Sequence, residues 1–263
     1  MTNVEGIKPY MRVTERCDRK CPFCYSKDML IIPDAPVDDY YWGFYNFRAA
    51  GGREVGLMGG EPGCRKDLPQ VLEAAKFSGL ETTVYTNGKL RPAELFQMRD
   101  LIDHVSVSLD GQTADVNDGY RGRGQWQRAV DIIQWFQPDQ VPFSLKVDTV
   151  VHAKNINKID GIALLFDAKP IKWKLLQFVP RLKGFEVKDQ FEISAEQFDE
   201  KVLLLQKRHP GKVITAGGYD PSQSAHVLIM RPDGTLQVDD GPGYKTIGNF
   251  FREPFERIAT KMN

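Results

Sequence analysis

Three cysteines within eight residues constrain this chain more than any other feature. Cys17, Cys21 and Cys24 lie four and three residues apart in the run Cys-Asp-Arg-Lys-Cys-Pro-Phe-Cys. Three thiolates on one loop can ligate three irons of a 4Fe–4S cube, a cluster that proteins usually hold with four cysteines. The fourth iron then stays open to bind and activate a small molecule. The triplet therefore predicts a catalytic iron–sulfur site.

Two other uses of cysteine fit the sequence less well. A structural zinc site needs four ligands, normally supplied by two CxxC-like pairs. The one remaining cysteine, Cys64, has no such partner. A disulfide framework is typical of smaller secreted chains with more cysteine. Since no cysteine follows Cys64, we expect no second cluster in the C-terminal part.

The overall charge and the N-terminal sequence limit the partners of the chain. Its 263 residues carry 35 basic and 35 acidic side chains, so no global positive charge favours long nucleic acids. The first residues lack an apolar signal core, and no apolar run approaches the length of a membrane span. We therefore expect a cytoplasmic protein that acts on a small molecule and does not contact a membrane.

Short β-rich runs alternate with helical patterns over residues 1–180. Strands are predicted at residues 10–14, 54–58, 82–86, 104–109, 143–151 and 171–178, and helices at 39–50, 68–77, 92–98, 125–136 and 156–165. Six such units predict an α/β fold, a parallel sheet curled into a partial (β/α)6 TIM barrel. Chemistry in such barrels gathers at the C-terminal ends of the strands, and the cysteine loop follows the first strand.

Residues 181–263 are predicted to form a C-terminal α+β extension that closes the active site within the same domain. Ser194 is a good N-cap for a helix over residues 194–208. The turn sequence Arg-Pro-Asp-Gly predicts a hairpin between residues 226–230 and 235–238. A short closing helix is expected within residues 248–262.

The cysteine run, with an aromatic residue before its third cysteine, resembles the signature of the radical S-adenosylmethionine (SAM) superfamily. In that superfamily the amino and carboxylate groups of SAM chelate the open iron. One electron then splits SAM into methionine and a 5′-deoxyadenosyl radical. The resemblance implies a radical SAM barrel, a 4Fe–4S cluster on Cys17, Cys21 and Cys24, SAM as a cofactor, and an external one-electron reductant such as flavodoxin or ferredoxin.

A second motif, Gly59-Gly60-Glu61-Pro62, follows the second predicted strand. It resembles the GGE element that holds the amino group of SAM in the superfamily. Glycines let a ligand approach the backbone closely, and a neighbouring carboxylate can accept hydrogen bonds from an ammonium group. Phe23 matches the aromatic position that packs on adenine.

Further candidates for the SAM site come from loops at the predicted strand ends: Tyr25, Asn87, Ser108, Asp110 and Arg123. Ser108 and Asp110 are placed to reach ribose hydroxyls, although alternating polar residues are also ordinary on a strand. Arg123 can pair with the methionine carboxylate of SAM or with a phosphate, or it is a solvated loop arginine. Tyr25 fits a core position equally well, and Asn87 lies in a Thr-Asn-Gly turn.

Beyond this core, the chain resembles viperin and its prokaryotic relatives. That family converts a nucleoside triphosphate into its 3′-deoxy-3′,4′-didehydro analogue, an antiviral chain terminator. Gly122-Arg123-Gly124-Gln125 resembles the family's GRGQ loop, residues 145–151 its FKIN-S/T-V strand, and residues 172–177 its RWKVFQ strand. The resemblance implies a nucleotide dehydratase, a lyase, whose substrate contacts include Lys146, Asp148, Lys172, Lys174 and His226.

Lysines that converge from two strands suit a polyphosphate, although lysine is also common on edge strands. Five positions differ from the family pattern. They are Asp18 and Asp148 for asparagine, Glu54 for lysine, Met58 for serine, and His226 for tyrosine. Added negative charge beside a triphosphate is costly in a desolvated pocket. Either the substrate is not CTP, or it carries fewer phosphates, or Arg53 and Lys89 compensate.

Two other functions remain open from the sequence. A radical SAM enzyme that acts on a peptide or on a protein glycyl radical has the same single cluster and a comparable size. A non-catalytic iron–sulfur or zinc scaffold would have no need of the GGE element.

Overall fold

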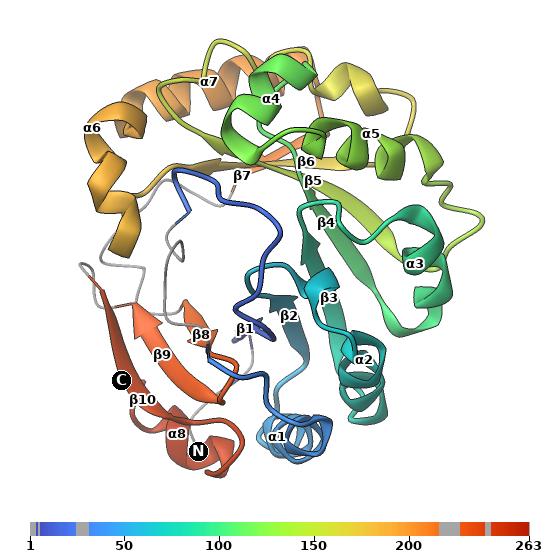
Figure 1. Ribbon diagram of the computed structural model, residues 1–263, viewed down its shortest axis with the longest axis vertical. Coiled ribbons are helices and arrows are strands. Elements are labelled where there is room, and N and C mark those ends of the chain that lie inside the picture. The colour runs from blue at the N-terminus through green and yellow to red at the C-terminus, as the bar shows by residue number, and fades with distance from the viewer. Residues whose placement is uncertain (1–3, 5, 25–31, 216–226, 240–242, 263) are drawn as a thin grey trace.

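The computed structural model describes residues 4, 6–24, 32–215, 227–239 and 243–262, and they form one ten-stranded sheet in the order β10-β9-β8-β1-β2-β3-β4-β5-β6-β7. Its central strands follow the chain order and pair in parallel throughout. They are β1 (Tyr10–Arg12), β2 (Glu54–Met58), β3 (Glu81–Thr86), β4 (His104–Ser108), β5 (Ser144–Val151), β6 (Lys172–Gln177) and β7 (Val213–Thr215). The sheet curls into an open arc with the helices outside it (Figure 1).

The helices cover the outer face of the arc because alternate strand residues are apolar there. Val105, Val107, Val147 and Trp173 are buried in one core with helix residues such as Ile133. The helices are α1 (Val37–Ala49), α2 (Leu68–Phe77), α3 (Pro92–Gln97), α4 (Ala114–Arg121), α5 (Gln125–Trp135), α6 (Lys188–Phe191), α7 (Ala195–Arg208) and α8 (Phe255–Ala259). None of the helices described is long and apolar enough to cross a membrane.

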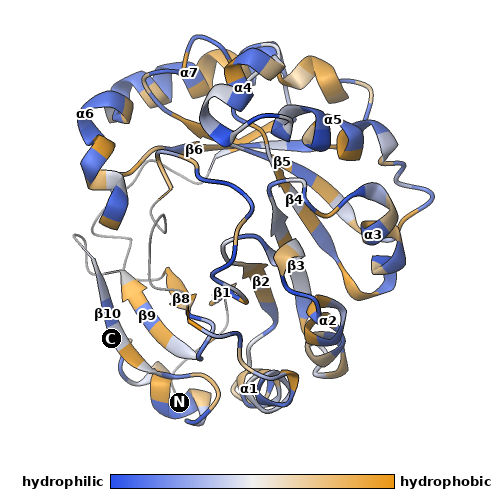
Figure 2. Cartoon of the chain, viewed as in Figure 1, coloured by the Kyte–Doolittle hydropathy of each residue, from blue (hydrophilic) through white to orange (hydrophobic). Residues whose placement is uncertain are grey.

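The inner face of the arc is polar, which is unusual for parallel strands buried on both faces. Side chains alternate across a strand, so the residues between those core positions, such as Ser106, Lys146, Asp148 and Lys174, face the inside. Figure 2 shows that the segment after β1, which crosses the inside of the arc, is hydrophilic. The barrel interior is therefore built to hold polar groups.

The C-terminal part extends the sheet beyond β1. Strand β8 (Leu228–Met230) pairs in parallel with β1, and Tyr10 lies opposite Ile229. Strands β9 (Thr235–Asp239) and β10 (Tyr244–Asn249) continue it as antiparallel ribbons. The predicted fold, a partial barrel of parallel strands with a C-terminal α+β extension, is confirmed.

Several local predictions were wrong or incomplete. Residues 156–165 form turns and a 3-10 helix (Ala163–Phe166) instead of an α-helix. Gly161 interrupts that segment, and its amide bonds to Gln112 Oε1 at 2.9 Å instead of closing a helical turn. Helix α4 and the short strand β7 were not foreseen. In the tail, β10 takes the place of the first part of the expected closing helix, which is confined to Phe255–Ala259.

Candidate functional site

The three cysteines lie on the segment that follows β1. Cys17 is exposed and Cys21 and Cys24 are half-buried, and the amide of Cys24 donates to Cys21 O at 3.2 Å. Although Cys17 is exposed as a residue, desolvation of its thiol raises the pKa to about 12. Burial also raises the pKa of the Cys21 thiol. Without metal, both sulfurs are therefore protonated thiols at neutral pH.

The donor set on this segment fits an iron–sulfur cluster, because three thiols are the ligands such a cluster takes. Within the described part of the chain, no three Cys, His, Asp or Glu side chains converge closely enough to form a ready metal site. Metal binding deprotonates its thiol ligands, so loading would draw these sulfurs together and release their protons.

Gly59 and Gly60 bring the second motif against the backbone that leads into Cys17. The Gly60 amide donates to Thr14 O at 2.7 Å, and the Glu61 amide donates to Arg16 O at 2.8 Å. A Cβ atom on Gly60 would lie 2.3 Å from Arg16 O. The sequence predicts that these glycines let a ligand approach the backbone. In the structure they instead allow the backbone of the cysteine loop to pack closely against them.

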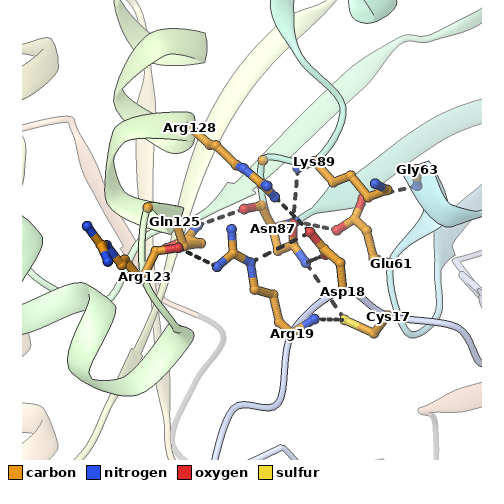
Figure 3. Close-up of polar contacts among 12 residues, drawn as sticks. Cys17, Asp18, Arg19, Glu61, Gly63, Asn87, Lys89, Arg123, Gln125 and Arg128 are labelled. Atoms are coloured by element: carbon orange, nitrogen blue, oxygen red, sulfur yellow. Dashed lines mark hydrogen bonds and ion pairs between the residues drawn. The ribbon is translucent and has the colours of Figure 1, made fainter.

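Glu61 is 1% exposed, and its carboxylate joins two loops at the ends of neighbouring strands (Figure 3). It accepts hydrogen bonds from Thr86 Oγ1 at 2.8 Å, from the Asn87 amide at 2.6 Å and from the Gly63 amide at 3.1 Å. Burial raises its pKa to about 7 in spite of these donors. Pro62, also buried, begins the 3-10 turn after it. The expected contact of this carboxylate with the SAM ammonium stays a prediction.

This raised pKa predicts how the stability of the metal-free protein depends on pH. An acid with a raised folded-state pKa binds its proton more tightly when folded. The free energy of unfolding should therefore fall as pH rises from 4.5, the ordinary value, to about 7. The loss from Glu61 is on the order of 3 kcal/mol. Urea unfolding between pH 5 and pH 8 should show a shallower pH dependence for Glu61→Gln than for wild type. Equal slopes would assign the pH dependence to other groups, such as Asp148, whose pKa burial also raises.

Asp18, next to Cys17, connects the cysteine segment by hydrogen bonds to the turn at Asn87 and to helix α5. Its carboxylate accepts hydrogen bonds from Asn87 Nδ2 at 3.0 Å and from Arg128 Nη1 at 2.7 Å. Burial alone would raise the pKa of Asp18, but these donors outweigh it and lower the pKa. The Cys17 sulfur accepts from the Arg19 amide at 3.4 Å and lies 3.8 Å from Asn87 Nδ2. Two donors are thus directed at the Cys17 sulfur (Figure 3).

The Gly122–Gln125 loop completes this network, mainly through its backbone and Gln125. The side-chain amide of the buried Gln125 donates through Nε2 to Asn87 O at 2.8 Å and to Ser108 O at 2.7 Å. Arg19 donates to the carbonyl of Arg123 at 2.8 Å. The exposed Arg123 side chain points away from Cys17 in Figure 3, so only its carbonyl joins the network. The sequence places Gln125 in a motif without indicating a role for it.

Asp110 and Ser108 lie at the end of β4 in different surroundings. Asp110 is completely buried, its carboxylate is paired with Arg121, and it accepts from the Val150 amide at 2.8 Å. Ser108 is half-buried. In this conformation the chain itself uses the Asp110 carboxylate, so Ser108 is the freer candidate for a ribose hydroxyl.

Phe23, between Cys21 and Cys24, belongs to a small aromatic cluster against which Cys21 also packs. It is 8% exposed and packs with Phe178 and Phe191, and its ring centroid lies 5.3 Å from that of His152. Its expected contact with adenine stays a prediction. Tyr25, the neighbouring candidate, lies outside the described residues.

Two of the three predicted substrate lysines share the barrel interior. Lys146 Nζ lies 5.7 Å from the centroid of the Tyr85 ring, and Asp148 stands opposite Lys174 on the next strand. Lys172 is exposed instead, and its ammonium donates to Gly211 O. Lys172 therefore stands opposite Lys146 in the strand register, but its ammonium is held at the surface and does not join the other two. The predicted contact of His226 lies outside the described residues.

Sequence reasoning missed the partner of Glu54. Lys8 Nζ lies 2.9 Å from Glu54 Oε2 and also donates to Thr83 Oγ1 at 2.9 Å. The parallel register that puts Tyr10 opposite Gly56 also brings Lys8 beside Glu54, so knowledge of the strand pairing would have revealed it. Arg53 is exposed, and Lys89 lies at the Asn87 turn. Lys8 therefore compensates Glu54 directly.

Comparisons with known proteins agree with this geometry. The sequence model described as "Radical SAM superfamily" matches residues 11–167. An S-adenosylmethionine-dependent nucleotide dehydratase of Lacinutrix mariniflava is 30% identical over 229 residues, which cover 81% of this chain and 46% of the relative. A PqqA peptide cyclase of Ruegeria pomeroyi is 29% identical, with 68% and 49% covered. The chain thus spans about half the length of the curated relatives it matches.

Among solved structures, Streptococcus suis SuiB bound to S-adenosylmethionine superposes with a TM-score of 0.75 over 94% of this chain and 64% of SuiB. The two sequences are 16% identical. This similarity concerns the fold.

Proposed function

We propose that this chain, which belongs to the radical SAM superfamily, acts on a nucleoside phosphate. Membership of the superfamily makes it an enzyme with a 4Fe–4S cluster and SAM as cofactors. In the proposed reaction a hydrogen atom is taken from C4′ of the ribose, and the 3′-hydroxyl then leaves as water with one proton and one further electron from the external reductant, giving a 3′-deoxy-3′,4′-didehydro nucleotide. Cluster and SAM supply the one-electron chemistry when they are bound. We place the cluster on Cys17, Cys21 and Cys24.

The lysine pair inside the barrel is the observation that carries this proposal. Lys146 and Lys174 project from neighbouring strands onto the polar inner face, the face that the cysteine segment crosses. Burial lowers the pKa of Lys146, so its ammonium is partly desolvated. A charge in such a setting interacts more strongly with an anion than it would in water. A phosphate group offers several acceptor oxygens for two converging ammonium groups.

The similarity to the Lacinutrix mariniflava dehydratase supports the same substrate class, and the match covers most of this chain. The tethered loops fit this function because radical chemistry needs its reactants held in place. The Gly60 turn, Asp18 and Gln125 hold the cysteine segment over the strand ends.

A peptide substrate is the second candidate. The similarity to the PqqA peptide cyclase is of the same order as that to the dehydratase. For a peptide, Lys146 and Lys174 would have no phosphate to bind, and removing both would leave turnover of the true substrate nearly unchanged.

The lysine variants test the proposal. Anaerobically reconstituted protein with an external reductant should form 5′-deoxyadenosine faster with a nucleoside phosphate than without one. Lys146→Ala and Lys174→Ala should each raise KM about tenfold or more, since a charge-assisted hydrogen bond contributes about 1.5–3 kcal/mol. Lys172→Ala is the matched control, and its KM should stay near wild type because that ammonium is bound to Gly211 O. Equal KM values for all three variants would remove the lysine pair from the substrate site.

A further inference from the structure

Building on the proposed function, we infer that the barrel interior is built for a nucleotide with a single phosphate and that Glu54 excludes longer polyphosphates. A phosphate monoester carries about 1.5–2 negative charges at neutral pH. Each further phosphoryl group adds negative charge that a desolvated site has to balance. The positive charge available in the interior therefore sets how many phosphates it can accept.

Lys8 is not available to bind a phosphate. Its ammonium is held by Glu54 and Thr83, both at 2.9 Å. To bind a phosphate, Lys8 would have to give up the carboxylate, and the freed Glu54 would then repel the same phosphate. The pair therefore contributes no net charge to the interior.

Lys146 and Lys174 remain, and they share one carboxylate. Asp148 stands opposite Lys174 in the register of β5 and β6, and two ammonium groups with one carboxylate leave a net charge of +1. Asp148 is 8% exposed, and its Oδ1 accepts no hydrogen bond from the described residues. If Asp148 takes up a proton, the net charge becomes +2. Either value suits one phosphate.

Arg12 and Arg121 add no net positive charge either, because each is paired with a carboxylate, Glu15 and Asp110. Arg19 and Arg128 share Asp18, and their one excess charge lies at the cysteine loop beside Cys17. Segments 25–31, 216–226 and 240–242, outside the described residues, contain one lysine, Lys27, and no arginine, against three aspartates. By composition they bring no excess of positive charge.

The position of Glu54 allows it to limit the number of phosphates on the substrate. Two tyrosine rings connect it to Lys146. Lys146 Nζ lies 5.7 Å from the centroid of the Tyr85 ring, that ring lies 5.8 Å from the Tyr10 ring, and Tyr10 stands opposite Gly56 on the strand that begins with Glu54. A polyphosphate extending from Lys146 towards β2 would reach the Lys8–Glu54 pair, which has no net positive charge to balance a further phosphate in a partly desolvated space. A single phosphate on Lys146 and Lys174 ends before that point.

The test compares nucleoside mono-, di- and triphosphates of the four common bases as stimulators of 5′-deoxyadenosine formation. In wild type the monophosphate should have the highest kcat/KM. Glu54→Gln removes the carboxylate that neutralises Lys8 and frees its ammonium for a further phosphate, so the ratio of triphosphate to monophosphate kcat/KM should rise about tenfold or more. Adding Lys8→Met to Glu54→Gln should reverse part of that rise. Glu73→Gln, the same change on an exposed position of α2, should leave the ratio unchanged.

Two results would overturn the inference in distinguishable ways. If wild type prefers a triphosphate and Glu54→Gln leaves the ratio unchanged, the limit of one phosphate is wrong while the nucleotide function stands. If no nucleoside phosphate of any length raises 5′-deoxyadenosine formation, the inference falls together with the proposed function. Equilibrium binding of the same nucleotides, measured with each variant, gives the same ratios independently of turnover.

Discussion

Replacing Cys17, Cys21 or Cys24 by alanine should abolish both the bound cluster and the reductive cleavage of SAM. Wild-type protein reconstituted without oxygen should hold about four irons and four sulfides. A cube left with two protein ligands has two open irons and is easily lost. Iron and sulfide analysis, together with 5′-deoxyadenosine formation, measures both effects.

Cys64→Ala is the matched control, because Cys64 is also a half-buried free thiol. It stands at the end of the 3-10 turn Pro62–Cys64, away from the cysteine run in sequence. This variant should keep its iron and its SAM cleavage. An active Cys21→Ala variant, or an inactive Cys64→Ala variant that has lost its iron, would contradict the ligand assignment.

Gly60→Ala should destabilise the metal-free protein by about 3 kcal/mol, the upper part of the usual range for a single substitution. The new Cβ would lie 2.3 Å from Arg16 O and 2.6 Å from Glu15 O. Both are backbone atoms, so no flexible side chain can move aside. The cysteine segment would have to shift, and iron retention should fall as well. The sequence alone predicts that a bulky residue here weakens SAM binding and leaves the cluster in place.

Gly119→Ala controls for the chemical change itself. Gly119 lies in α4, and a Cβ atom added there would have no described neighbouring atom within 4 Å. Alanine favours a helix over glycine by about 1 kcal/mol, so this variant should be as stable as wild type or slightly more stable. Urea unfolding measures both variants. The free energy of unfolding of Gly60→Ala could instead lie within about 0.5 kcal/mol of the wild-type value, as for a neutral surface substitution. That result would show that the close approach of Gly60 to Arg16 does not constrain the cysteine loop.

Local patterns predicted the elements whose boundaries depend on nearby residues. Strand Glu54–Met58 and helix Leu68–Phe77 have the expected bounds, because an apolar run ends at the glycine pair and Pro69 favours a helix start. The helix that begins after Ser194 also has the expected N-cap, which forms a reciprocal pair with Gln197. The cysteine loop follows β1 as the barrel rule requires.

The direction of individual side chains could not be predicted in the same way. Asp18 and Arg128 are 110 residues apart in the chain, and Lys8 meets Glu54 only once β1 and β2 are paired. Such contacts depend on the strand register and on the curvature of the sheet. Neither produces a repeating pattern of residues that could be recognised in the sequence. For the same reason Lys172 and Lys174 looked equivalent, although the first binds Gly211 O at the surface and the second faces the interior.

Transfer of deuterium from the substrate's ribose to 5′-deoxyadenosine tests the central claim most directly. A nucleotide deuterated throughout its ribose is incubated with the reconstituted enzyme, SAM and reductant, and the mass of the 5′-deoxyadenosine is measured by mass spectrometry. We predict one deuterium in the 5′-deoxyadenosine and loss of the 3′-oxygen from the nucleotide. Unlabelled 5′-deoxyadenosine with every ribose-deuterated nucleotide, together with label transfer from a deuterated peptide, would contradict the proposed function.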